Sequence, residues 1–246
     1  MVRFKTINDI INQVASEVAS LPTVSDVFAE ADPAYQQLIN LANTSGYELL
    51  QTYPWEQLVR SEQFITQAAD SGIYELPDDF AYMINQTGWE RSENVPLFGP
   101  LSAQAWTYLL GRDLVSYTIY ASFRQAQGQF WLFPQPPAEG LDINYEYISR
   151  NWVEDSSQPG TYDDKVKAAG DKVLYEAILF ERLLKTRFLE ARGFDSQKAL
   201  DQYVLSLDAW GARDKGAPVL NAGRGGWVYP YLDSYNNTPD TNFGAP

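Results

Sequence analysis

The chain has 246 residues, 45% of them hydrophobic and 20% charged, a composition typical of folded globular proteins. It contains no cysteine and no histidine, which excludes disulfides, thiolate nucleophiles, histidine-based catalytic triads and metal sites built on imidazole or thiolate. Its formal net charge of −14, from 18 basic and 32 acidic residues, disfavours tight binding to the phosphates of nucleic acids or anionic membranes.

Residues 1–55 predict two helices. The first begins at the capping residue Thr6 and ends before Pro22. Its apolar residues recur at helical spacing: Ile7, Ile10, Ile11, Val14 and Val18. The second begins at Asp32, because an aspartate cap followed by a proline is typical of the start of a helix.

Residues 56–155 predict a β-rich module of antiparallel strands with one short helix. The helix covers 103–110, where Ser102 caps it and Gly111 ends it. Gly128 marks a hairpin turn. The strands are short runs of β-branched and aromatic residues separated by turn sequences: 64–66, 73–76, 82–87, 116–125, 129–133 and 141–152.

Residues 156–215 predict two further helices. The first covers 163–191, about 40 Å at 1.5 Å per residue, and ends at Gly193. Asp195 caps the second, whose apolar face comprises Leu200, Tyr203, Val204, Leu207 and Trp210. Charged residues on these helices either pair between subunits or form a solvated face: Lys165, Lys167, Lys185 and Arg187 with Asp163, Asp164, Glu181 and Glu190.

Residues 216–246 predict an extended C-terminal tail, because they are rich in Gly, Pro, Asn and Asp and show no helical period. Ordering such a segment costs about 1–2 kcal/mol per residue, whereas each buried aromatic side chain returns about 1.5–3 kcal/mol. The tail is therefore either disordered or ordered by a partner. Aromatic residues alternate at positions 227, 229 and 231, which favours a strand added to the edge of a partner's sheet. Pro230 restricts this strand to an edge position. The candidate docking residues are Trp227, Tyr229, Tyr231, Tyr235 and Phe243.

These elements together predict an α+β fold: an antiparallel four-helix bundle with an inserted antiparallel β module and an extended C-terminal tail. The predicted boundaries are 1–55 for the first two helices, 56–155 for the β module, 156–215 for the last two helices and 216–246 for the tail.

The acidic and aromatic middle of the chain raises an enzyme hypothesis, since glycoside hydrolases use two carboxylates beside aromatic platforms. In the alternative interpretation, which we favour, the acids occupy turns and strand faces and the tryptophans fill the core. The candidate acids and platforms are Glu75, Asp78, Asp79, Glu90 and Glu146, with Trp89, Trp106, Trp131 and Trp152.

We expect no metal site and no cofactor. The aspartate pairs at 78–79 and 163–164 lack the alternating spacing that surrounds calcium. The second pair is better explained as capping the start of a helix, where negative charge is favourable.

Three sequence runs resemble the head-to-tail adaptor proteins of tailed, particularly short-tailed, bacteriophages: residues 76–80 (LPDDF), 87–91 (TGWER) and 96–106 (PLFGPLSAQAW). The similarity continues in residues 130–134, 143–152 and 239–244. It implies a non-enzymatic virion protein of the neck or tail, assembled in the cytoplasm of the bacterial host. It also implies a dodecameric ring that joins the portal protein to the tail nozzle or tail tube and forms part of the DNA conduit.

The residues favour the same interpretation independently. A tail that cannot fold alone suits docking into a neighbouring subunit or the portal, and an acidic chain suits DNA that passes without tight binding. We expect no membrane partner, because no apolar run approaches the ~20 residues that span a bilayer and residues 1–12 lack the layout of a signal peptide. A peptidoglycan hydrolase and a glycan-binding virion module remain the alternatives.

Overall fold

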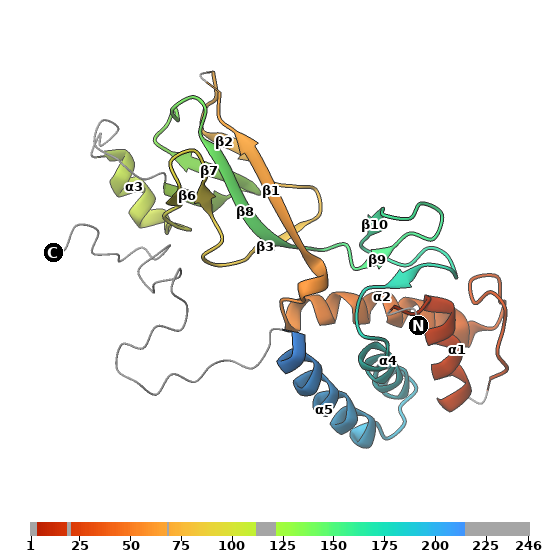
Figure 1. Ribbon diagram of the computed structural model, residues 1–246. Helices are drawn as coiled ribbons and strands as arrows, with labels where there is room; N and C mark the ends of the chain where they lie inside the picture. The colour runs from red at the N-terminus through yellow and green to blue at the C-terminus, as the bar shows by residue number, and fades with distance from the viewer. Residues whose placement is uncertain (1–3, 19–20, 68, 112–121, 215–246) are drawn as a thin grey trace. The chain divides into compact units, whose positions relative to one another are not determined.

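The computed structural model describes residues 4–18, 21–67, 69–111 and 122–214. They form two compact units: a helical unit drawn from Met1–Val59 and Ser149–Pro218, and a β unit drawn from Arg60–Ile148. The chain enters the β unit through strand β1 (Val59–Ile65) and leaves it through β8 (Asp142–Ser149), and these two strands pair with each other (Figure 1). The β unit is therefore an insertion between two helical segments.

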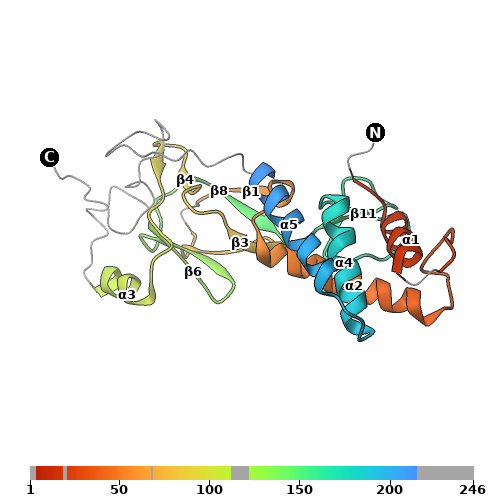
Figure 2. The ribbon, with the colours of Figure 1, turned by 90° about the horizontal axis from the view of Figure 1, so that it is seen from below.

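The helical unit combines helices with a small antiparallel sheet in which β9 is the central strand. Helix α4 contacts α1, α2 and α5, and the main contact of α5 is with α4 (Figure 2). A short 3-10 helix, η1 (Glu56–Leu58), precedes β1. The other elements are α1 (Ile7–Val18), α2 (Pro33–Thr52), β9 (Val153–Glu154), β10 (Tyr162–Asp163), β11 (Lys172–Val173), α4 (Ala177–Ala191) and α5 (Gln197–Asp214).

Local sequence signals start several helices, as predicted. The carboxylate of Asp32 accepts a hydrogen bond from the backbone N–H of Ala34 at 2.8 Å at the start of α2. The hydroxyl of Thr6 accepts from the N–H of Asp9 at 3.2 Å at the start of α1. These side chains satisfy backbone donors that have no partner within the helix.

The predicted four-helix bundle is wrong. Within the described residues the chain forms five α-helices and three antiparallel sheets, a mixed α+β fold, and α4 begins only at Ala177. The segment predicted to start this helix instead contains β10, a loop and β11. The reason is the buried carboxylate of Asp171, which accepts hydrogen bonds from the backbone N–H groups of Ser156, Lys167 and Ala168 at 3.1, 2.8 and 2.8 Å. These bonds hold the loop in a non-helical conformation.

An aromatic cluster fills the core of the helical unit. The ring of Trp152 packs against Tyr175 and Phe180, with centroid distances of 5.9 and 5.6 Å. Gly46 of α2 lies against the indole, and the hydroxyl of Tyr175 donates to the carbonyl of Gly46 at 2.9 Å. The absence of a side chain at Gly46 lets α2 approach this cluster closely.

The β unit has two sheets. In the first, the order is β1-β8-β4-β5, and β3 also pairs with β8; in the second, the order is β2-β7-β6. Helix α3 (Ala103–Gly111) packs Trp106 against Phe133, with centroids 6.1 Å apart. The remaining strands are β2 (Ile73–Glu75), β3 (Phe80–Met83), β4 (Trp89–Glu90), β5 (Val95–Pro96), β6 (Ser122–Ala126) and β7 (Gln129–Phe133).

A stack of three rings joins the two sheets. Tyr145 of β8 stacks on Phe130 of β7, which stacks on Phe123 of β6, with centroid distances of 5.1 and 5.0 Å. The predicted hairpin at Gly128 is confirmed, with β6 and β7 paired and positive φ angles at Gln127 and Gly128. The first part of the predicted strand 116–125 lies outside the described residues, as does the predicted tail. No helix among the described residues is long and apolar enough to cross a membrane.

Candidate functional site

Glu90, one of the five candidate catalytic acids, holds a turn. Its side chain is 3% exposed, and its carboxylate accepts hydrogen bonds from the backbone N–H groups of Ser92, Glu93 and Asp142 at 2.8, 2.7 and 3.3 Å. These donors belong to the turn after β4 and to the first residue of β8. The carboxylate therefore satisfies buried backbone groups, as the structural interpretation expects.

Asp79 accepts a hydrogen bond from the hydroxyl of Tyr147 at 2.8 Å. Burial, and then this bond, raise the pKa of Tyr147, so the phenol stays protonated. Glu62 of β1 lies near the same group: burial, and then the negative charge of Asp79, raise the pKa of Glu62. Sequence reasoning missed Glu62, although its half-buried position alternates with exposed neighbours along the strand.

The other candidate acids lie on separate elements of the β unit. Glu75 is exposed on β2, Asp78 is exposed in the loop before β3, and Glu146 is exposed on β8. Turns and strand faces are the positions that the structural interpretation assigned to them.

The aspartate pair at 163–164 does not begin a helix, so the predicted capping role is wrong. Asp163 of β10 forms an ion pair with Lys167, and the carboxylate of Asp164 accepts from the hydroxyl of Tyr47 at 2.8 Å. Across residues 4–18, 21–67, 69–111 and 122–214, no group of three acidic side chains is placed to hold a metal ion.

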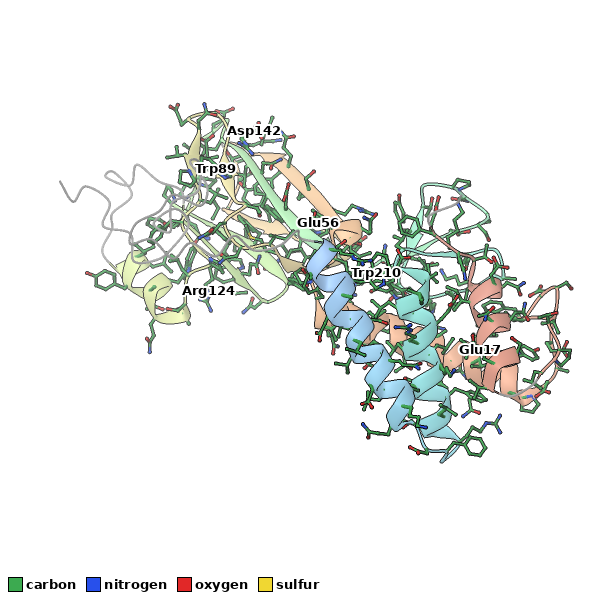
Figure 3. The ribbon with its side chains drawn as sticks, turned by 60° about the horizontal axis from the view of Figure 1, so that its bottom comes forward. Glu17, Glu56, Trp89, Arg124, Asp142 and Trp210 are labelled. Carbon is green, nitrogen blue, oxygen red and sulfur yellow. The ribbon has the colours of Figure 1, made fainter. Side chains whose placement is uncertain are left out.

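The four candidate tryptophans do not form one sugar-binding platform. Trp152 is 0% exposed and belongs to the helical unit, whereas the other three belong to the β unit. Trp106 is 2% exposed and packs edge-on against Trp131, with centroids 6.1 Å apart. Trp89 of β4, labelled in Figure 3, lies under the guanidinium of Arg91 at 5.6 Å. Trp106 and Trp152 fill the cores of the two units.

Several charges of the last helices pair within the helical unit. Lys185 of α4 binds Glu17 of α1, which is labelled in Figure 3, at 3.2 Å. Arg187 binds Glu48 of α2 and, at 2.6 Å, Glu190. Glu181 likewise binds a lysine near the N-terminus of the same chain, at 2.8 Å. These contacts attach α4 to α1 and α2, so the charges concerned already have partners in their own chain.

Helix α5 exposes several apolar side chains, which lie among the exposed acids Asp201 and Asp208. Its buried residues, which include Tyr203 and Gly211, occupy one side of the helix. Val204 and Leu205 are 44% and 68% exposed, so Val204, which was predicted to lie on the apolar face of this helix, is not buried. Because one residue turns the helix by about 100°, the neighbour of a buried residue readily lies outside the contact. We call the exposed residues Val204, Leu205, Ala209 and Ala212 the α5 stripe.

The β unit also contains a cavity of about 440 Å³, which we call the β3 groove. It lies between the end of β3 and strand β6, within the size range of sites that bind ligands. Its lining includes Tyr82, Met83, Ile84, Pro100, Phe123 and Gln125.

The predicted docking residues of the tail lie outside the described residues, so the structure places none of Trp227, Tyr229, Tyr231, Tyr235 and Phe243. The candidate interaction surfaces that the structure does describe are the α5 stripe and the β3 groove. Neither was predicted, because both depend on which neighbouring elements cover which face.

Comparison with known protein families indicates an adaptor protein. The family model described as SU10 adaptor protein matches residues 5–230, which include all elements of both units. No curated protein matches the chain significantly. The chain therefore belongs to the SU10 adaptor protein family, which confirms the expected relationship to the head-to-tail adaptors of tailed bacteriophages.

Proposed function

We propose that this phage adaptor is a non-enzymatic component of the virion neck that assembles as a dodecameric ring, joins the portal to the tail nozzle or tail tube, and forms part of the DNA conduit. The observation that carries the proposal is the family match over residues 5–230. It covers the helical unit, the β unit and the start of the predicted tail, so the role belongs to the whole chain and not to one module.

The α5 stripe supports ring formation. Copies of a chain with a net charge of −14 repel one another overall, so contacts that do not depend on charge favour association. Exposed apolar side chains such as Leu205 supply them when a second copy covers them. In a closed ring the stripe meets a different surface of the next copy, because ring interfaces are heterologous.

The charge also supports the proposed conduit. DNA entering or leaving a capsid must slide past the protein, and basic clusters would hold its phosphates through counterion release. An excess of 14 acidic charges opposes such retention.

The test is assembly with the portal protein. The purified protein, mixed with its portal, should give a stoichiometric ring by native mass measurement and particle imaging. Leu205→Arg should prevent the ring without lowering the unfolding temperature, because it changes an exposed position. Ile65→Arg, at a comparably exposed apolar residue of the β unit, is the matched control and should assemble normally. A strictly monomeric wild-type protein without affinity for the portal would contradict the proposal.

The non-enzymatic part of the proposal has its own test. Purified protein should release no more material from peptidoglycan than a buffer blank. Release that is lost in Glu62→Gln or Glu146→Gln would instead reveal a hydrolase.

A further inference from the structure

The β3 groove lies along the unpaired edge of a strand. Among the described residues, β3 pairs with β8 alone. The backbone N–H of Ile84, directly after β3, donates to the carbonyl of Glu146 on β8 at 2.9 Å. Since backbone groups alternate in direction along an extended strand, those of Ala81 and Met83 point away from β8. Met83 also lines the groove, so this edge offers it unpaired donors and acceptors.

The opposite wall of the groove supplies a polar group and an aromatic surface. Strand β6 contributes Phe123 and Gln125, and Tyr82 adds a second ring from the side of β3. The side-chain nitrogen of Gln125 is buried and has no hydrogen-bond partner among the described residues. A buried donor without a partner is unfavourable, and a carbonyl entering the groove would satisfy it.

The chain itself contains a segment with the matching chemistry. Residues 227–231 read Trp-Val-Tyr-Pro-Tyr, so three aromatic side chains share one face of an extended strand. Pro230 lacks an N–H and alternates with the aromatic positions, so the segment can pair fully along one edge only. A groove with one open strand edge and an aromatic wall needs a ligand that pairs along one edge only, so this segment is sufficient.

We infer that the β3 groove of one copy binds residues 227–231 of a second copy as an added β-strand. That the bound segment comes from a second copy rests on the proposed ring, in which the tails of some copies lie beside the grooves of others. The 13-residue path from Asp214, the last residue of α5, to Trp227 spans up to about 45 Å when extended, enough to reach an adjacent subunit. The aromatic side chains fill the groove, and Ala81 and Met83 supply the backbone pairing.

A complementation experiment tests the inference on full-length chains. All variants carry Leu205→Arg, which removes association through the α5 stripe. One has an intact groove and a tail with Trp227→Ala, Tyr229→Ala and Tyr231→Ala; the other has an intact tail and a blocked groove, Tyr82→Arg. Each alone should stay monomeric, and an equimolar mixture should form a one-to-one dimer, detected by analytical ultracentrifugation. Tyr108→Arg in place of Tyr82→Arg is the matched control, since it changes an exposed tyrosine of α3 that does not line the groove, and it should self-associate.

Peptide binding supplies a second measurement. A fluorescent peptide of residues 224–234 should bind the tail-substituted chain, and Tyr82→Arg or Gln125→Trp in that chain should weaken binding at least tenfold. Tyr108→Arg should leave it unchanged. If Tyr82→Arg does not fold, Gln125→Trp replaces it as the blocked groove in both experiments.

Two results would overturn the inference. The first is a folded mixture that forms no dimer, or a Tyr108→Arg control that stays monomeric because its tail occupies the groove of its own chain. The second is a peptide that binds the portal but not the groove. Failure of the proposed function has a different signature: dimer formation and peptide binding would persist while the wild-type protein gives no ring with the portal.

Discussion

Replacing Gly46 by alanine should destabilise the helical unit, although alanine is the better helix former. Gly46 lies inside α2, where the change from glycine to alanine would ordinarily gain about 1 kcal/mol. An ideal Cβ at this position would lie 2.7 Å from Cδ2 of Trp152 and closer still to Cε2 and Cζ2. Real carbon atoms in contact stay about 3.5–4.0 Å apart, so the helix or the indole must move.

The indole has no free direction in which to move, since Trp152 is fully buried and held by Tyr175 and Phe180. Overpacking of such a core costs about 1–3 kcal/mol. Shifting α2 would also weaken the hydrogen bond from Tyr175 to the carbonyl of Gly46, worth about 1 kcal/mol. Against the gain in helix propensity, we expect a net loss of about 2 kcal/mol and a fall of about 4–8 °C in unfolding temperature.

Differential scanning calorimetry measures this effect, and Gly211→Ala is the matched control. Gly211 lies inside α5 and also faces an aromatic ring, but its added Cβ would meet Tyr53 at an ordinary 3.4 Å. Its propensity gain should therefore remain, raising the unfolding temperature. Trp152→Phe should recover part of the loss in the Gly46→Ala background. If Gly46→Ala unfolds at or above the wild-type temperature, the steric reasoning is wrong.

Three further predictions concern charge and the tail. Burial, and then the charge of Asp79, raise the pKa of Glu62, so the ionised form of Glu62 disfavours the folded state. Glu62→Gln should therefore unfold at a higher temperature than wild type at pH 7. This difference should disappear as the pH falls below 4.5, the ordinary pKa of this side chain. Arg187→Lys should lose about 0.5–1 kcal/mol in urea unfolding, because lysine cannot bind Glu48 through two nitrogens, and an unchanged midpoint would contradict this. Deleting residues 216–246 should change the free energy of unfolding by less than about 1 kcal/mol while preventing docking, and a loss comparable to that of a core helix would show that the tail stabilises its own subunit.

Sequence reasoning succeeded where neighbouring residues determine the structure. Asp32 followed by proline starts α2, and Gly128 marks the turn between β6 and β7. Each signal acts within a few residues, since a cap bonds to the next turn of helix and a hairpin glycine supplies its own positive φ.

Residues 163–176 were mispredicted because their conformation depends on distant groups. Val166 and Val173 are seven residues apart, the spacing of one helical face, and both are buried. Their burial comes instead from a loop and strand β11, which pairs with β9. Asp171 bonds both within this segment and to Ser156, which lies 15 residues away. Hydrophobic spacing cannot reveal such a bond.

The candidate site was predicted only in part for the same reason. Residue type identified Asp79 as a candidate acid, but Glu62 gains its perturbed pKa from burial and from Asp79, which lies in the turn before β3. Tyr203 and Val204 have similar apolar character in the sequence, yet contact with α4 buries only the first.

Strand pairing explains why half of the inferred docking contact can be read from sequence and half cannot. The alternating aromatic residues at 227–231 are close together in the sequence, whereas the open edge of β3 depends on strand pairing, because β8 is its only partner among the described residues. An unpaired edge beside an apolar groove promotes indiscriminate association, and proteins usually shorten, charge or cover such edges. β3 has four residues and places Tyr82, not a charge, beside its groove. Such an edge does not cause indiscriminate association when a dedicated strand covers it. In the inferred contact, the tail of a second copy supplies that strand on assembly.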